Sequence, residues 1–263
     1  MKQVAVITGA ASGIGRGMVE RFAAEGMAVV LADIEEAPLA KLEQDLRANG
    51  ANVLAVRTDV SNANDVENLA VQTYNTYGAV HILCNNAGVV CSRPIWEHTI
   101  ADWEWVLGVN LWGVIHGIRA FVPRMLSQET ECHIVNTASI LGLVRGPGEG
   151  IYKVSKHAVV ALSETLADEL AQNGSQIQVH VLCPGWVRTG ILDSSRNRTD
   201  SESHHHNRNI TDNRDVRAEM DAGMSPAEVA DHVYNAMQSG IFYIHTHPEH
   251  KAWVQARMED ILK

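Results

Sequence analysis

The sequence predicts one α/β domain built on a doubly wound parallel sheet of about seven strands, with helices on both faces. Short continuous apolar runs, such as Val4 to Ile7, alternate along the chain with patterns of helical period. An unbroken apolar run of this length is typical of a strand that is buried on both faces of a parallel sheet. The predicted strands also end in small or polar residues, at the edge where folds of this class bind their ligands.

The first half of the chain predicts four strands and three helices. A glycine-rich turn joins the first strand to a helix over residues 16–26. The second strand, residues 27–32, ends at Asp33, and the helix over 37–49 stops at Asn49-Gly50, which is typical of a helix C-terminus. A strand over 53–57, a helix over 65–77 that Gly78 ends, and a strand over 80–84 follow.

The second half begins with a long helical pattern over residues 103–125 and a buried strand over 133–139. A helix then opens at Tyr152 and runs to about residue 170, followed by a sixth strand over 176–182. Residues 190 to about 222 are polar with little periodicity, so we expect a long loop of the kind that forms a lid. Ser225 and Pro226 are typical of a helix start. That helix reaches residue 239, and a strand over 241–246 and a terminal helix to 262 complete the chain.

Composition narrows the class of protein. The chain has 263 residues, 46% of them hydrophobic, and a formal net charge of −10, which argues against nucleic acid or an anionic membrane as its main partner. No uncharged apolar stretch reaches the roughly 18 residues of a membrane-spanning helix, and the N-terminus has no secretory pattern. Cys84, Cys91, Cys132 and Cys183 lack metal-type spacing, so we expect free thiols in the cytoplasm.

Two side chains predict proton-transfer chemistry. Tyr152 and Lys156 are four residues apart in a predicted helix, so they lie on one face of it. A nearby ammonium favours the phenolate and lowers the pKa of the tyrosine, which can then exchange a proton with a substrate oxygen near neutral pH. Ser139 ends a predicted strand upstream of this helix, where its hydroxyl could hold the same oxygen.

The N-terminal turn predicts a dinucleotide site. Gly9, Gly13 and Gly15 lie between a strand and a helix, where glycines let the backbone approach a pyrophosphate at a helix N-terminus. Asp33 ends the next strand and can accept hydrogen bonds from ribose hydroxyls, whereas it would repel a 2′-phosphate. Neither Ser12 nor Ile34 is basic, so we expect NAD rather than NADP.

These motifs together resemble the classical short-chain dehydrogenase/reductase family. The resemblance covers nearly the whole chain and implies a Rossmann-type fold that transfers hydride between NAD and a carbon bearing a secondary alcohol or ketone. By the same resemblance, Tyr152 exchanges the proton, Lys156 also bonds the nicotinamide ribose, and Ser139 orients the substrate oxygen. Asn110, within Val109-Asn110-Leu111-Trp112-Gly113, would complete a tetrad by holding a relay water.

The resemblance also implies a set of cofactor contacts and a substrate pocket. Asp59-Val60 would lie beside the adenine, Asn86-Ala87-Gly88 would line the cofactor, and the Pro-Gly-x-x-x-Thr segment from Pro184 would lie under the nicotinamide. The predicted cofactor residues are Gly9, Ser12, Gly13, Ile14, Gly15, Asp33, Ile34, Asp59, Val60, Asn86, Ala87, Gly88, Tyr152, Lys156, Pro184, Gly185, Val187 and Thr189. The predicted pocket residues are Val90, Ile140 and Trp186.

In domain terms we expect a core over residues 1–189, a substrate lid over 190–223 and a C-terminal helix–strand–helix over 224–263. The family resemblance implies a homotetramer (or homodimer), in which the C-terminal part forms an interface and the helices at 103–125 and 152–172 pair. The segments expected to line the pocket are residues 89–96, residues 140–145 and Trp186. Because they are largely apolar, we expect a small-molecule substrate that is hydrophobic, aromatic, cyclic or steroid-like. A carboxylate-bearing substrate is an alternative, because Arg93 and Arg145 could bind a carboxylate.

Two other functions are possible on the same fold. A catalytically silent NAD-sensing regulator on the same fold would usually lack part of the tetrad. A halohydrin dehalogenase would replace Lys156 and lose the glycine-rich loop. No metal is expected at His204, His205 and His206, because three consecutive histidines do not converge on an ion as residues four apart on a helix do. None is expected at His245, His247 and His250 either, because no carboxylate cluster accompanies their spacing.

Overall fold

The structure, a computed structural model, describes residues 2–198 and 214–263. Its centre is a parallel seven-stranded sheet with the order β3-β2-β1-β4-β5-β6-β7. The order reverses between β1 and β4, which in doubly wound folds places the ligand crevice at the carboxyl ends of these strands. The predicted fold class is therefore confirmed. The strands are β1 (Val4–Thr8), β2 (Ala28–Asp33), β3 (Asn52–Arg57), β4 (Ile82–Asn85), β5 (Cys132–Thr137), β6 (Ile177–Cys183) and β7 (Tyr243–His245).

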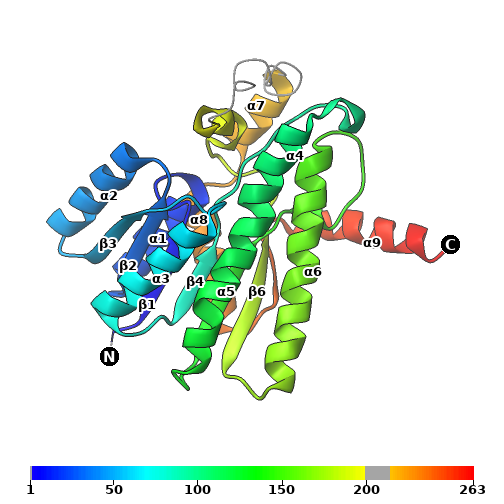
Figure 1. The fold of residues 1–263 in the computed structure, drawn as a ribbon. Coiled ribbons are helices and arrows are strands. Elements are labelled where there is room, and N and C mark those ends of the chain that lie inside the picture. The colour runs from blue at the N-terminus through cyan, green and yellow to red at the C-terminus, as the bar shows by residue number, and fades with distance from the viewer. Residues whose placement is uncertain (1, 199–213) are drawn as a thin grey trace.

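Helices cover both faces of the sheet (Figure 1). α1, α2 and α8 pack on one face through side chains such as Phe22, Leu39 and Val233, whereas α3, α5 and α6 cover the other, with Leu69 and Phe121 in the core. The helices are α1 (Gly13–Ala24), α2 (Glu36–Ala48), α3 (Ala63–Tyr77), α4 (Ile100–Leu107), α5 (Gly113–Leu126), α6 (Gly150–Gln172), α7 (Arg214–Ala222), α8 (Pro226–Gln238) and α9 (Lys251–Ile261).

The long helix predicted over residues 103–125 is one helical run from Ile100 to Leu126, interrupted by a π-helical turn, Gly108–Trp112. Among the described helices this run alone is long and apolar enough to cross a membrane by length and composition. It carries Asp102 and Arg119, so it contains no uncharged stretch of that length. Phe121 is buried against the sheet, as in the core helix of a folded domain.

The expectation of an irregular segment over residues 190–222 is wrong at both of its described ends. A 3₁₀ segment, Ile191–Asn197, opens it and α7 closes it. Val216 and Met220 lie one turn apart on α7 and pack in a small apolar cluster with Val90, which accounts for the helix. His204, His205 and His206 lie outside the described residues.

Two histidines are buried where β5 meets β6. The Nδ1 of His133 lies 3.0 Å from the Nε2 of His180, and the Nδ1 of His180 lies 2.7 Å from the carbonyl oxygen of Ile241. Burial, followed by the proximity of His180, lowers the pKa of His133 to about 4, and burial also lowers the pKa of His180. Both rings are therefore neutral at pH 7.

This pair predicts that stability falls with acid. In the unfolded chain His133 takes up a proton below pH 6.5, whereas in the folded protein it does so only near pH 4. Its contribution to the free energy of unfolding is therefore complete above pH 6.5 and is lost as the pH falls. Between pH 7 and pH 5 we expect the free energy of unfolding to drop by about 2 kcal/mol from His133. Urea unfolding at the two pH values should show a smaller drop for His133→Asn, but an unchanged drop for the exposed-site control His232→Asn. Equal drops in all three proteins would contradict this account.

Candidate active site

The carboxyl ends of β1, β4 and β5 are joined by a compact hydrogen-bond junction. The Thr8 hydroxyl accepts from the backbone N–H groups of Asn86 and Ala87, at 2.9 and 3.1 Å, and donates to the carbonyl of Cys84. The Asn86 side chain donates to the carbonyl of Thr8 and accepts from the hydroxyl of Thr137. Residues that follow these three strands are therefore held at fixed positions around one crevice.

The glycine-rich turn after β1 packs too closely for side chains. A Cβ on Gly15 would lie 2.0 Å from the carbonyl oxygen of Gly9, and one on Gly9 would lie 2.9 Å from the Cα of Ala87. Gly9 also has φ +65°, a conformation that favours glycine. Helix α1 begins directly after Ser12, so its N-terminal N–H groups face the same crevice as the turn. This cradle fits the pyrophosphate of a dinucleotide.

Asp33 lies at the end of β2 beside this turn. Its carboxylate accepts from the backbone N–H groups of Ala11, at 2.9 Å, and Glu35, at 3.0 Å. Burial raises the pKa of Asp33, while these backbone hydrogen bonds oppose the rise. The carboxylate borders the groove, where it can accept hydrogen bonds from ribose hydroxyls.

One groove runs from Asp33 to Tyr152 and collects most of the predicted cofactor residues. Those that line it are Gly9, Ser12, Gly13, Ile14, Asp33, Ile34, Asp59, Val60, Asn86, Ala87, Gly88, Tyr152, Lys156, Pro184 and Thr189. Gly15, Gly185 and Val187 do not line it. Gly15 lies beneath Gly9, Gly185 packs against His247 and His250, and Val187 is in the hydrophobic core. These three support the walls of the groove from behind.

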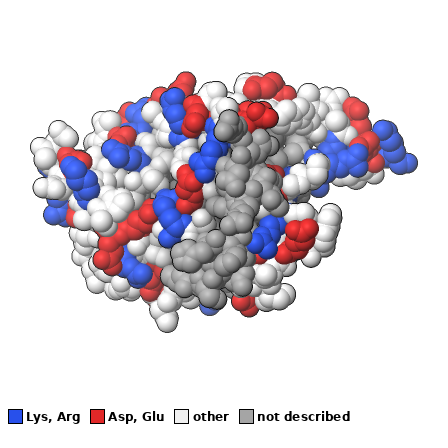
Figure 2. Space-filling view, turned by 90° about the horizontal axis from the view of Figure 1, so that it is seen from above, with Lys and Arg blue, Asp and Glu red and all other residues white. Residues whose placement is uncertain are grey.

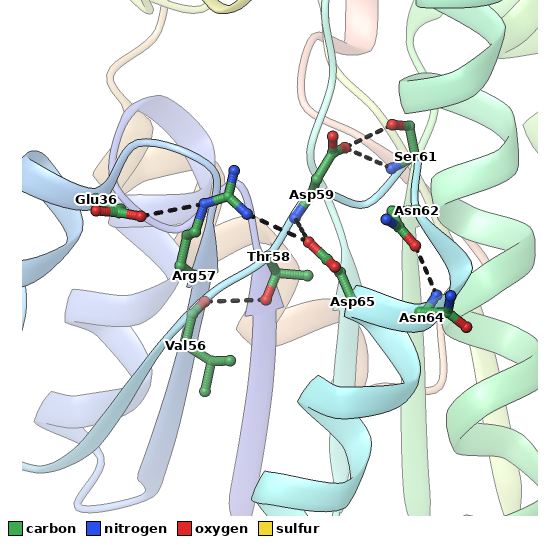
Figure 3. Close-up of polar contacts among 9 residues, drawn as sticks. All are labelled: Glu36, Val56, Arg57, Thr58, Asp59, Ser61, Asn62, Asn64 and Asp65. Carbon is green, nitrogen blue, oxygen red and sulfur yellow. Dashed lines mark hydrogen bonds and ion pairs between the residues drawn. The ribbon is translucent and has the colours of Figure 1, made fainter.

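The groove also includes residues that the sequence analysis missed. Thr58 and Ser61 flank the predicted Asp59-Val60 pair, and Asp59 accepts hydrogen bonds from the backbone and hydroxyl of Ser61 (Figure 3). Their position after a strand end was a usable signal. Six others were not predicted as cofactor contacts but lie in segments expected near the substrate: Val89 in the pocket, and Gly190, Ile191, Ser194, Arg196 and Asn197 in the lid. No local signal marks the rest, because separate segments bring them to the groove. They are Glu35, Trp105, Val109, Thr137 and Ala138.

Tyr152 lines one end of the groove, and Ser139 lies beside it without lining the groove itself. Ser139 follows β5, and its hydroxyl accepts from the backbone N–H of Leu141 at 3.1 Å. Burial raises the pKa of Tyr152 to about 12, although the nearby Ser139 hydroxyl acts in the opposite direction. A hydroxyl next to a phenol can offer a substrate oxygen two hydrogen-bond donors.

Lys156 lies one turn beyond Tyr152 on α6, as predicted, but it does not lower the pKa of the tyrosine here. Its ammonium donates to the carbonyl of Thr137 at 2.7 Å and lies 5.4 Å from the centre of the Tyr152 ring. The expected lowering of the tyrosine pKa is absent because the cost of burying a phenolate dominates. Burial also lowers the pKa of Lys156 to about 8, so its ammonium form still prevails at neutral pH.

Asn110 lies in the π-helical turn and is fully buried. Its side chain accepts from the N–H of Val89 at 2.8 Å and donates to the carbonyl of Val89 at 2.9 Å and to the Ser155 hydroxyl at 3.1 Å. A Cβ built on Gly88 would lie 3.6 Å from both the Asn110 amide oxygen and the Lys156 nitrogen. Asn110 and Lys156 therefore flank the same backbone turn.

The three predicted pocket residues differ in position. Val90 belongs to an apolar cluster with Leu192 and Met220, against which Tyr152 packs. Ile140 is buried beside Ser139, and Trp186 is 38% exposed on the loop after β6. None of the three lines the groove itself. Val90 therefore forms part of an apolar wall next to the tyrosine, whereas the geometry gives Trp186 no such role.

A buried ion pair fixes the chain beside this wall. Asp102 on α4 caps its own helix with Thr99 and pairs with Arg198 at 2.5 Å, both side chains being at most 1% exposed. Cys91 and His98 lie close enough to Asp102 to suggest a metal site. However, the guanidinium of Arg198 already neutralises the carboxylate, which disfavours a second cation there.

Comparison with known proteins agrees with this geometry. The family model for short chain dehydrogenases matches residues 3–200. A short chain dehydrogenase/reductase from Burkholderia phymatum, whose crystal structure is in complex with NAD, is 45% identical with a TM-score of 0.95, over 99% of this chain and 94% of that one.

Two named enzymes are also similar in sequence. The 1-deoxy-11-beta-hydroxypentalenate dehydrogenase of Streptomyces avermitilis is 36% identical over 98% of this chain and 89% of its own length. The 3beta-hydroxysteroid dehydrogenase 2 of Eggerthella lenta is 40% identical over 72% of each chain. Together with the glycine cradle, Tyr152 and Lys156 along one groove and Ser139 beside Tyr152, these matches show that the chain belongs to the short-chain dehydrogenase/reductase family of oxidoreductases.

Proposed function

We propose that this protein interconverts a secondary alcohol and a ketone with NAD as its cofactor. The observation that carries the proposal is Tyr152, which lies beside Ser139 and Lys156 at one end of a groove whose other end holds the Asp33 carboxylate. The groove joins a proton-transfer site to a ribose site. When bound, the nicotinamide exchanges hydride with the carbinol carbon, and its oxidised form adds a positive charge that favours the phenolate of Tyr152.

The side chains divide the remaining work. Ser139 holds and polarises the substrate oxygen, and Tyr152 takes its proton on oxidation or returns one on reduction. Lys156 reaches the carbonyl of Thr137 and borders the groove, so its ammonium can also bond ribose hydroxyls. Asn110 is fixed by Val89, and the π-helical turn around it departs from the usual helical hydrogen bonding, which supports a role in holding a relay water.

NAD is preferred over NADP in this proposal because Asp33 would repel a 2′-phosphate. A similar protein bound to NAD supports the choice. The apolar cluster of Val90, Leu192 and Met220 beside Tyr152 supports a hydrophobic cyclic substrate, and two similar enzymes are named for steroid and pentalenate alcohols. An aromatic secondary alcohol would fit the same wall.

For assembly and location, we propose a cytoplasmic homotetramer. Trp112 and Val154, 50% and 44% exposed, leave apolar surface on the helical run 100–126 and on α6, where subunits could pair. Figure 2 shows acidic and basic side chains interspersed over the described part of one face, which is not the basic surface of a nucleic-acid-binding protein.

Tyr152→Phe tests the chemistry. Removing the phenol oxygen should lower turnover of a cyclic secondary alcohol by about 10²–10⁴-fold, because the proton then has no acceptor, while NAD affinity should stay within about twofold. The rate of NADH formation and NAD titration calorimetry measure the two effects. Tyr234→Phe, on α8 away from the groove, is the control and should leave both unchanged. Undiminished turnover in Tyr152→Phe would refute the assignment, and NAD binding by the wild type without turnover of any alcohol would favour a regulator.

Gly15→Ala tests the cradle. The added Cβ would meet the carbonyl oxygen of Gly9 at 2.0 Å and the amide of Asn86 at 2.7 Å, so the turn must move and NAD binding should weaken by about tenfold or more. Gly108→Ala, whose Cβ meets only Ser61 at 3.5 Å, is the matched control. Thermal unfolding of both variants separates lost binding from lost folding. NAD affinity that is equal in the two folded variants would argue against a pyrophosphate at this turn.

A further inference from the structure

The adenosine end of the groove is closed by an ion pair between distant parts of the chain. Arg196, at the end of the 3₁₀ segment Ile191–Asn197, donates from Nε and Nη2 to the two carboxylate oxygens of Glu35, each at 2.9 Å. Glu35 follows Asp33 by two residues, and both residues of the pair line the groove. Two parallel hydrogen bonds of this kind fix a guanidinium in direction as well as in position.

The remaining nitrogen of Arg196 is also engaged. Its Nη1 donates to the carbonyl oxygens of Gly190, at 3.2 Å, and Asp193, at 3.0 Å. Among the described residues that line the groove, the basic side chains are Lys156 and Arg196, and Lys156 belongs to the catalytic end. Arg196 is therefore the guanidinium at the ribose end, and all three of its nitrogens have partners.

Arg57 offers a useful contrast. It is paired in register with Asp33 on the neighbouring strand, and its guanidinium lies between Glu36, at 3.3 Å, and Asp65, at 3.6 Å (Figure 3). It does not line the groove. Glu36 thus holds an arginine outside the cofactor site, whereas Glu35, one residue earlier, holds one inside it.

We propose that Glu35 is a specificity-determining residue that masks Arg196 by pairing with it. The guanidinium beside the ribose could bind a phosphate, but the pair with Glu35 prevents it from doing so. The inference rests on the proposed use of NAD. A 2′-phosphate on that ribose is a dianion for which a guanidinium is the preferred bidentate partner. While Glu35 is ionised it occupies this guanidinium, and the bond to Arg196 lowers the pKa of Glu35.

The ion pair between Glu35 and Arg196 can separate. The side chains of Arg196 and Glu35 are 40% and 21% exposed, so the guanidinium can turn without disturbing the core. Removing the charge of Glu35 leaves a neutral amide that competes weakly with a phosphate dianion. Discrimination between the two cofactors then depends on Asp33 alone.

The test measures binding by titration calorimetry with NAD and NADP, and so does not require a substrate. In Glu35→Gln, NADP affinity should rise by about tenfold or more, the equivalent of one charge-assisted hydrogen bond, while NAD affinity changes by less than about threefold. Glu36→Gln removes the same charge one residue later and should leave both affinities unchanged. In Glu35→Gln/Arg196→Gln the gain in NADP affinity should vanish, and raising the salt concentration should reduce it in Glu35→Gln.

Each other outcome is decisive. NADP affinity that is unchanged in a Glu35→Gln variant that still binds NAD overturns the inference and leaves the proposed function standing. An equal gain in NADP affinity in Glu35→Gln and in Glu35→Gln/Arg196→Gln means that the charge of Glu35 itself repels the 2′-phosphate. That outcome overturns the masking of Arg196. If the wild type binds neither nucleotide, the proposed function itself fails. If it already binds NADP as tightly as NAD, Glu35 masks nothing.

Discussion

The site depends on the junction that ties together the ends of β1, β4 and β5. Thr8 and Asn86 exchange hydrogen bonds across β1 and β4, and Thr137 bonds Asn86 from β5. A functional segment follows each of these strands. These segments are the glycine turn after β1, the turn at Gly88 after β4 and the segment that bears Ser139 after β5. The carbonyl of Thr137 also receives the ammonium of Lys156. A parallel sheet brings these strand ends to one edge, and the hydrogen bonds of the junction fix their positions relative to one another.

Much of this arrangement can be predicted from the sequence because it is encoded locally. Apolar runs mark buried strands, and the spacing of Tyr152 and Lys156 on a helix fixes their common face. α7 was missed because its polar residues dominate, although Val216 and Met220, one turn apart, were a usable signal for a helix. The pair of Glu35 with a residue 161 positions away could not be predicted, since no local pattern encodes it.

The Tyr152 pKa shows a different limit of sequence reasoning. Spacing correctly predicts that Lys156 lies next to the tyrosine, but the sign of the pKa shift depends on burial and on where the ammonium points. Here the ammonium is directed to Thr137, and the buried phenol has a raised pKa. A buried phenolate becomes accessible only when more positive charge enters the groove. Without a cofactor, the protein therefore keeps Tyr152 protonated. In our proposal Tyr152 acts as a base when the oxidised cofactor is bound.

The segment that begins at Ile191 connects these two ends of the groove. Asp193 pairs with Arg217 of α7 at 2.7 Å, Arg196 reaches the ribose end, and Arg198 is buried against α4. One short stretch of chain is thus held by three ion pairs to three different elements. The buried Asp102–Arg198 pair fixes the end of the segment, whereas the two partly exposed pairs hold it more weakly. Because the same stretch borders both the cofactor groove and the apolar wall beside Tyr152, its ion pairs help to set the positions of these two parts of the site relative to each other.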